Sequence, residues 1–248
     1  MSDPAAPAAV LALDSVDSTN AEALRRAPER PLWIVARRQT APRGSRGRAW
    51  SMPEGNFAAT LALRQSGTPP GLARLGFVAG LALHDALGVV TGERARLALK
   101  WPNDVLLDGG KLAGILLERE RAEGDAYAMA IGFGVNLAAA PKPDPSRLEA
   151  PRPVALAPEW SVPPEALLDA LRPAFAAREA QMARSGFEPI RAEWLARAAR
   201  LGEPVTARTL RETRTGVFET IDEMGHLILR TPAGRERVAS ADVFFEGA

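Results

Sequence analysis

Polar residues that could do chemistry are concentrated in the stretch 100–118, which otherwise consists of apolar runs. Asn103, Asp104 and Lys111 lie beside or inside two such runs, which are separated by the hairpin signal Asp-Gly-Gly at 108–110. Polar groups on buried strands cost free energy unless they have partners, so we expect these side chains to be used. The alternative is a hairpin with ordinary solvated ends.

The use of lysine supports a site at this hairpin. The chain has 31 Lys and Arg residues, yet only Lys100, Lys111 and Lys142 are lysine. Lysine is a compact point charge with rotatable donors, whereas arginine is a planar fork. Almost all other cationic residues of the chain are arginine, so a lysine is expected where a site needs the compact charge.

The loop 39–56 is rich in Arg and Gly and contains one Trp, Trp50. Arginine pairs with phosphate or carboxylate in a bidentate manner, and glycine gives the backbone freedom. Three interpretations compete: an RGG-like RNA contact, a solvated loop, and a mobile loop that orders over an anionic ligand. The shortness of the loop, its single aromatic residue and its position between strands weaken the RNA interpretation.

Composition limits the class of protein. The chain has 248 residues, of which 46% are hydrophobic and 25% charged, enough for one large domain or a large and a small one. A net charge of +1 gives no global attraction to nucleic acid or membrane. The absence of cysteine excludes disulfides, thiolate metal sites and a cysteine nucleophile. Residues 1–9 lack the pattern of a signal peptide, and we find no apolar run approaching the ~20 residues that span a bilayer.

Periodicity and turn signals place the elements around these residues. Thr19 and Glu22 fit a capping box, so we expect a helix to begin at Thr19. Gly132 and Gly134 lie inside a buried strand, which suggests a close approach by a ligand or backbone rather than a dinucleotide fingerprint. Further expected elements are strands at 10–13, 32–38, 57–63 and 127–137, and helices at 72–90, 165–184 and 189–200.

The composition changes at Leu201, where short strands become frequent. Turns near 223–225 and 232–234 separate several of them, which predicts a small β-barrel with a boundary near this residue. The strand candidates are 204–208, 216–221, 226–230, 236–239 and 243–245.

Taken together and in order, five short motifs resemble those of the biotin protein ligases, over nearly the whole chain. They are Asp17-Ser18-Thr19-Asn20, Gly47-Arg48-Ala49-Trp50, Lys100-Trp101-Pro102-Asn103-Asp104, Lys111-Leu112-Ala113-Gly114-Ile115-Leu116 and Ile131-Gly132-Phe133-Gly134-Val135-Asn136. The resemblance implies an α+β fold of the class II synthetase-like biotin/lipoate ligase type. It places a catalytic domain with a mixed sheet and packed helices at 1–200, and a small SH3-like β-barrel at 201–248.

The resemblance also implies the reaction and its cofactors. Biotin and ATP, with Mg²⁺, would give biotinyl-5′-AMP, and a lysine of the biotin carrier domain of a carboxylase would then take the biotinyl group. Catalytic roles fall to Lys111, Arg48 and Asp104, with Asp104 as the metal ligand. The implied biotin contacts are Ser18, Thr19, Asn20, Gln39, Arg43, Gly44, Ser45, Trp50, Lys111, Gly114 and Gly132. The implied nucleotide contacts are Arg46, Arg48, Trp50, Lys100, Asn103, Asp104, Gly134 and Asn136.

Two positions depart from the family loop, which usually reads Gly-Arg-Gly-Arg-x-Gly-Arg-x-Trp. Pro42 replaces a Gly and fixes φ, and Ser45 replaces an Arg and removes a cation. We therefore expect biotinyl-5′-AMP to be retained less tightly than with arginine at position 45.

Further expectations concern partners and location. Only 16 residues precede the Asp17 motif, too few for a helix-turn-helix, so we expect no direct DNA binding. We also expect no membrane contact, a cytoplasmic location and a possible homodimer. The alternatives to this function are a lipoate protein ligase, or a non-catalytic ligand-binding or RNA-binding protein.

Overall fold

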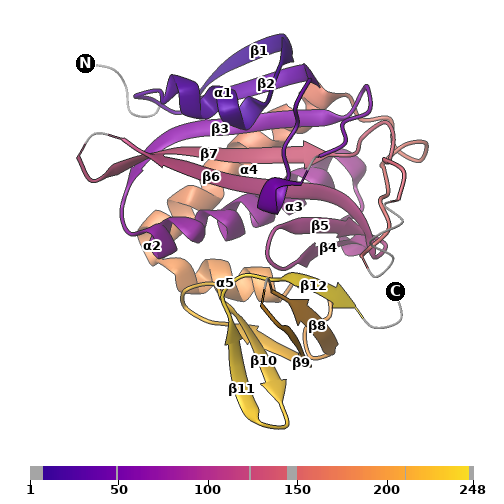
Figure 1. Cartoon of the computed structure of the whole chain (residues 1–248). Coiled ribbons are helices and arrows are strands. Elements are labelled where there is room, and N and C mark those ends of the chain that lie inside the picture. Colours follow the sequence, from indigo (N-terminus) through magenta and orange to yellow (C-terminus); the bar gives the residue numbers. More distant parts are fainter. Residues whose placement is uncertain (1–7, 49, 123, 144–149, 210, 246–248) are drawn as a thin grey trace.

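Two β-sheets organise the residues that the computed structural model describes, namely 8–48, 50–122, 124–143, 150–209 and 211–245. The larger is a seven-stranded mixed sheet in the order β1-β2-β3-β7-β6-β5-β4, and the smaller is a five-stranded antiparallel sheet (Figure 1). In the larger sheet β1 pairs with β2 in parallel, and all other neighbours are antiparallel. The strands are β1 Ala9–Val16, β2 Leu32–Gln39, β3 Phe57–Ser66, β4 Leu97–Lys100, β5 Asp104–Leu107, β6 Gly110–Arg121 and β7 Ala126–Val135.

The two faces of the larger sheet differ in what covers them. On β3, Phe57 and Leu61 belong to the main hydrophobic core, which also contains residues of α3 and α4. Ala62 of the same strand belongs to a small second cluster with Ala23 of α1. This alternation is the period-2 pattern of a strand covered on both sides. The helices are α1 Thr19–Arg26, α2 Pro69–Ala73, α3 Leu75–Thr91, α4 Pro164–Ser185 and α5 Phe187–Leu195.

Helix α3 is the central helix of the main core. Among the described residues, the helical stretch Gly71–Thr91 is long and apolar enough to cross a membrane by length and composition, and 67% of its apolar window is buried inside the protein. The expectation that no apolar run approaches this length was therefore wrong. A helix packed between a sheet and other helices is apolar on almost every side, so its composition resembles that of a membrane span.

The start of α1 differs from the expected capping box. The N-cap is Ser18, whose Oγ accepts a hydrogen bond from Ala21 N at 3.4 Å. Glu22 pairs with Arg25 and Arg26 instead of returning to the cap. The sequence interpretation thus placed the cap one residue too late. Because Ser18 caps the helix, the side chains of the next two residues are available for other contacts.

The smaller sheet follows the long helices, in the order β11-β10-β9-β8-β12. The five strands expected from turn signals are all present within a few residues, and the α+β fold with a small C-terminal β-structure is confirmed. They are β8 Pro204–Arg208, β9 Thr213–Ile221, β10 Leu227–Thr231, β11 Gly234–Val238 and β12 Asp242–Phe245.

The β9–β10 turn of the smaller sheet contacts α3 and the turn between β4 and β5. Trp101 Nε1 donates a buried hydrogen bond to Gly225 O at 3.0 Å. A Cβ at Gly225, where φ is +82°, would lie 2.5 Å from the Phe77 ring of α3. Both the left-handed backbone and this close approach require glycine. The smaller sheet therefore braces the turn between β4 and β5, which leads directly into Asp104.

A partly buried ion-pair network joins α3, α4 and α5. Arg178 donates to Asp85 Oδ2 at 2.9 and 2.7 Å and to Glu193 Oε2 at 2.6 Å. Burial by itself would raise the pKa of Asp85, but His84 and Arg178 outweigh burial and lower the pKa from 3.8 to about 2. A carboxylate with a lowered pKa stabilises the folded state above its unfolded pKa, and this contribution disappears as the pH falls from 3.8 toward about 2.

We therefore expect Asp85→Asn to lower the free energy of unfolding at pH 7 by about 2 kcal/mol, because the variant loses this linkage term. Chemical denaturation of wild type and variant at pH 7 and pH 3 measures the difference, which should shrink at the lower pH. Asp169→Asn, which changes an exposed carboxylate of α4, is the control and should leave stability unchanged. An equal loss for Asp85→Asn at both pH values would contradict the assignment.

Candidate active site

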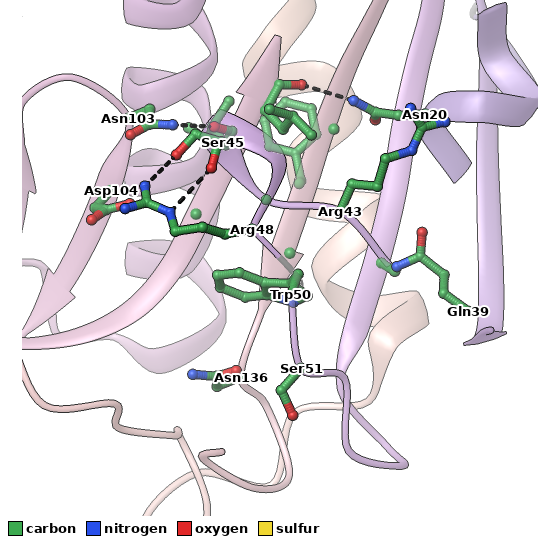
Figure 2. A pocket seen from close by; sticks show the side chains of 18 of the residues that line it. Asn20, Gln39, Arg43, Ser45, Arg48, Trp50, Ser51, Asn103, Asp104 and Asn136 are labelled. Atoms are coloured by element: carbon green, nitrogen blue, oxygen red, sulfur yellow. Dashed lines mark hydrogen bonds between the residues drawn. The ribbon is translucent and has the colours of Figure 1, made fainter. Parts of the chain in front are cut away.

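A cavity of about 470 Å³ lies on the face of the larger sheet that carries α1. It is walled by α1, the end of β2, the loop 40–56, β6 and β7. Figure 2 shows Asn20, Gln39 and Arg43 to one side of Trp50, with Asn103 and Asp104 to the other. The residues expected from the sequence that line it are Ser18, Thr19, Asn20, Gln39, Arg43, Gly44, Ser45, Arg48, Trp50, Asn103, Asp104, Lys111, Gly114, Gly132, Gly134 and Asn136. The structure thus brings these side chains together, while their individual roles stay predictions.

Small residues on three adjacent strands form the floor beneath Trp50. Strand register places Gly134 of β7 opposite Ala58 of β3 on one side and opposite Gly114 of β6 on the other. A Cβ at Gly134 would lie 2.8 Å from the Trp50 indole, and one at Gly114 would lie 3.0 Å from it. The close approach expected at the strand glycines is therefore made by a side chain of the loop 40–56, which these glycines allow to rest on the sheet.

A hydrogen-bonded corner of neutral polar groups closes one end of the cavity. Gln39 Oε1 accepts from Thr19 N at 2.8 Å and from Thr19 Oγ1 at 3.1 Å. Thr60 Oγ1 lies 2.8 Å from Thr19 Oγ1 and 2.7 Å from Asn20 Oδ1. Asn20 Nδ2 donates to Leu116 O at 3.1 Å and to the Glu118 carboxylate, which does not line the cavity, at 2.9 Å. Amide and hydroxyl groups fixed in this way can bind a neutral polar ligand group in one orientation.

Asn20 also explains why a third glycine is required near this corner. A Cβ at Gly132 would lie only 2.2 Å from Asn20 Oδ1. An alanine here would displace the amide from Thr60, so the glycine keeps the hydrogen-bonded corner in place.

The opposite end of the cavity carries charge. Lys111 Nζ lies 2.7 Å from Asp104 Oδ1, and Lys100 Nζ lies 3.7 Å from Asp104 Oδ2. Lys111 Nζ also lies 5.5 Å from the centre of the Trp50 ring. Burial by itself would raise the pKa of Asp104, but the two ammonium groups outweigh burial and hold this pKa below its usual value. The carboxylate is thus ionised at neutral pH, with cations on both sides.

Arg48 is held by its own loop and by the smaller sheet. Its Nε donates to Ser45 O at 3.1 Å and its Nη2 to Ser45 Oγ at 2.7 Å, contacts that place the guanidinium at the cavity (Figure 2). Its Nη1 and Nη2 reach the two oxygens of Asp242 at 2.9 and 3.1 Å. Ser45, where the resemblance leads one to expect arginine, therefore positions the neighbouring cation.

Two residues assigned to the nucleotide do not line the first cavity. Lys100 lines a second cavity of about 220 Å³, which adjoins the first at Asp104 and Lys111 and is closed by β12. Arg46 lines neither cavity, and its guanidinium instead contacts Asp242 and Ser240. A backbone φ of +61° turns this non-glycine residue away from the regular path of the loop.

Several residues at the site were not expected from the sequence. Thr60 orders the polar corner, and Asn56 Oδ1 accepts from Ala138 N at 2.9 Å, which fixes the chain that follows β7. Asp242 arrives from the far end of the chain. Lys142 lines the first cavity, so all three lysines of the chain lie at one of the two cavities. The rarity of lysine was the signal that could have found Lys142; the others carry no comparable pattern.

Asp104 is the residue suited to hold Mg²⁺ together with a nucleotide. Within the described part of the chain, no group of three or more His, Asp or Glu side chains could hold a metal ion by itself. Mg²⁺ usually binds through one or two carboxylates plus substrate phosphates and waters. One ionised carboxylate beside cations that can bind phosphate fits this mode of binding.

Comparison with known proteins identifies the family. The model of the biotin/lipoate A/B protein ligase family matches residues 12–136, and that of the biotin protein ligase C-terminal domain matches residues 201–246. A biotin–[acetyl-CoA-carboxylase] ligase of Paracoccus denitrificans is 55% identical over 239 residues, which is 95% of this chain and 100% of the relative. The bifunctional ligase/repressor BirA of Bacillus subtilis is 32% identical over 88% of this chain and 66% of the relative.

A solved structure supports the fold. The biotin protein ligase from Aquifex aeolicus in complex with biotin and ATP has a TM-score of 0.74 to this chain at 24% identity, covering 94% of this chain and 97% of that one. The family models and the 55% identical relative confirm the resemblance stated from the five sequence motifs. The chain belongs to the biotin/lipoate A/B protein ligase family.

Proposed function

We propose that this chain is a biotin–[acetyl-CoA-carboxylase] ligase, which forms biotinyl-5′-AMP from biotin and ATP and transfers the biotinyl group to a lysine of a carrier domain. The observation that carries the proposal is the position of Lys111. Its ammonium group lies 2.7 Å from Asp104 in a cavity whose other end is a corner of neutral polar groups. A relative of that name, 55% identical over its full length, supports this reading.

In the first step the biotin carboxylate attacks the α-phosphate of ATP, and pyrophosphate leaves. Two anions must meet, so fixed cations are needed where charge develops. We assign Lys111 to bridge the carboxylate and the α-phosphate, and Arg48 to bind the phosphate. Asp104 would hold Mg²⁺, which neutralises phosphate charge when bound. In the unliganded protein Lys111 and Asp104 neutralise each other, so each has a partner until the reactants arrive.

The polar corner would hold the ring end of biotin. Ser18, Thr19, Asn20 and Gln39 offer hydroxyl and amide groups to a ureido ring, and Gly132 leaves room for Asn20. Trp50 would cover the substrate from the loop side. Arg43, Gly44, Ser45 and Gly114 are assigned to the same ligand, and Arg46, Lys100, Asn103, Gly134 and Asn136 to the nucleotide.

In the second step the ε-amine of the acceptor lysine attacks the acyl carbon of biotinyl-5′-AMP. A carbon–nitrogen bond forms, the carbon–oxygen bond to phosphate breaks, the amine loses its proton and AMP leaves. Neither step requires a covalent intermediate on the protein, which suits a chain without cysteine. The acceptor is the carrier domain of a biotin-dependent carboxylase.

One incubation tests the proposal. The protein is mixed with biotin, Mg·ATP and a biotin carrier domain. The mass of the carrier domain is measured by mass spectrometry, and the pyrophosphate released is measured in parallel. Biotin-dependent pyrophosphate release and one biotinyl group on the carrier support the ligase. Activity with lipoate and a lipoyl domain alone would establish the alternative ligase, and ligand binding without turnover would establish a binding protein.

The serine at position 45 gives a prediction about the intermediate. Ser45→Arg adds a cation beside the proposed adenylate phosphate, so we expect biotinyl-5′-AMP to leave about threefold to tenfold more slowly than from the wild type. Trapping the released adenylate after dilution measures the rate. Thr40→Arg adds the same charge at an exposed loop position outside the cavity and serves as the control. Equal rates of adenylate release from the wild type and Ser45→Arg would contradict this prediction.

The remaining assignments follow from this function. We divide the chain into a catalytic domain at 1–200 and an SH3-like domain at 201–248, place it in the cytoplasm, and keep the absence of DNA and membrane binding as predictions. A homodimer also stays a prediction, which light scattering at several protein concentrations can test.

A further inference from the structure

The C-terminal sheet reaches the proposed phosphate-binding arginines through one carboxylate. Asp242, the first residue of β12, contacts Arg48 through both of its oxygens and contacts Arg46 Nη1 at 3.1 Å. The second cavity is lined by Asp242 together with Arg48, Lys100 and Lys111. In this state the carboxylate of Asp242 therefore binds the two arginines that are proposed to bind phosphate.

The donors of Arg48 are almost fully used in this state. A guanidinium has five N–H groups. Ser45 takes one N–H from Nε and one from Nη2, and Asp242 takes one from each of Nη1 and Nη2. Counting the contacts with described residues, a single Nη1–H remains, which cannot bind a phosphate in the bidentate manner that arginine favours. Bidentate binding of a phosphate thus requires Arg48 to release Asp242 or Ser45.

Arg46 shows that the same carboxylate also holds the loop. Its φ of +61° is a backbone conformation that side-chain-bearing residues rarely adopt and that the surroundings must maintain. The contacts of its guanidinium are with Asp242 of β12 and with Ser240, which lies between β11 and β12, at 3.1 and 3.4 Å. The smaller sheet therefore holds the unusual conformation of the loop as well as the guanidinium of Arg48.

We propose that Asp242 is a positioning residue that holds Arg46 and Arg48 while the site is empty and competes with the phosphates of ATP for Arg48. The proposal rests on the assignment of Arg48 to the adenylate phosphate. ATP displaces Asp242 from Arg48, so part of its binding energy is used to break this contact. Removal of the carboxylate frees the arginines and takes one negative charge away from the path of a polyanion.

The test compares Asp242→Asn with the wild type in biotin-dependent pyrophosphate release at varied Mg·ATP. We expect the KM for ATP to fall about threefold to tenfold, with kcat for adenylate formation unchanged within about twofold. Asp242→Glu retains the carboxylate, so its KM for ATP should equal that of the wild type. Glu212→Gln removes a carboxylate that pairs with Arg214 beside β9 and is the matched control with an unchanged KM.

The outcomes separate the inference from the function on which it rests. An unchanged or higher KM for ATP in Asp242→Asn would contradict competition between Asp242 and ATP. A fall in KM of the same size in Asp242→Glu would contradict it as well. Calorimetric titration with Mg·ATP alone gives a second readout that needs no turnover, and a tighter Kd for Asp242→Asn and Asp242→Ala is expected. If the wild type releases no biotin-dependent pyrophosphate, the proposed function is refuted. If the wild type turns over normally but the Asp242 variants have the wild-type KM for ATP, only the inference about Asp242 is refuted.

Discussion

Lys111→Ala should abolish measurable formation of biotinyl-5′-AMP. The variant removes the ammonium group that is proposed to lie between the biotin carboxylate and the α-phosphate as charge develops. Loss of one such preorganised group typically lowers the rate about 10²–10³-fold, which corresponds to about 3–4 kcal/mol of transition-state stabilisation. Arginine should not replace it, because a planar fork cannot occupy the place of a compact ammonium group. Biotin-dependent pyrophosphate release at saturating Mg·ATP measures the effect.

A matched change on the same strand checks that the loss comes from the site. Arg119 lies on β6 with its guanidinium 5.7 Å from the Tyr127 ring, away from the cavity, and Arg119→Ala should retain activity. Supplying Lys111→Ala with synthetic biotinyl-5′-AMP and the carrier domain separates the two half-reactions. A near-normal yield of adenylate from Lys111→Ala would remove the central element of the proposed mechanism.

Asp104→Asn should lower the rate of adenylate formation roughly a hundredfold and raise the Mg²⁺ concentration needed for half-maximal activity. The amide is neutral, so it is a poor magnesium ligand and no longer neutralises the two lysines beside it. The side chain of Lys100 is only 8% exposed and lies 3.7 Å from this carboxylate. Removal of a negative charge beside a buried cation is costly, so the melting temperature should fall as well. A magnesium titration of the initial rate measures the change in affinity.

Two further variants distinguish the loss of the metal ligand from a general loss of structure. Asp104→Glu keeps the negative charge, so its half-maximal activity should require a lower Mg²⁺ concentration than that of Asp104→Asn. Asp108→Asn changes the carboxylate that directly follows β5, where φ is +49° and asparagine is well tolerated, so activity should persist. An unchanged magnesium titration for Asp104→Asn would show that this carboxylate does not bind the ion.

Local signals in the sequence were sufficient for most elements. The Asp-Gly-Gly turn placed the β5–β6 hairpin, and the turns near 223–225 and 232–234 placed the strands of the smaller sheet. The exceptions have physical causes. The choice between Ser18 and Thr19 as N-cap depends on backbone angles, which two adjacent hydroxyl residues do not reveal. The length of the apolar α3 was underestimated because a helix buried all round has no polar face to break its composition.

Much of the candidate site was found because its motifs are contiguous. Lys111 and Asp104 lie on paired strands, so a hairpin brings them together. Asp242 lies 194 positions from Arg48, and only the packing of the smaller sheet brings them into contact. Thr60 looks like an ordinary strand residue until the register sets it opposite Gly132. Contacts that depend on tertiary packing leave no short-range pattern.

The gathering of the lysines at the two cavities has a practical consequence for labelling. Apart from the α-amino group, amine-reactive dyes and coupling resins have only these residues to attack, and Lys142 is the exposed one on the rim of the first cavity. Attachment through amines would therefore obstruct the entrance for substrates. Because the chain contains no cysteine, one thiol introduced on the far strand β11 would provide a unique handle for immobilisation or fluorescence without touching the cavities.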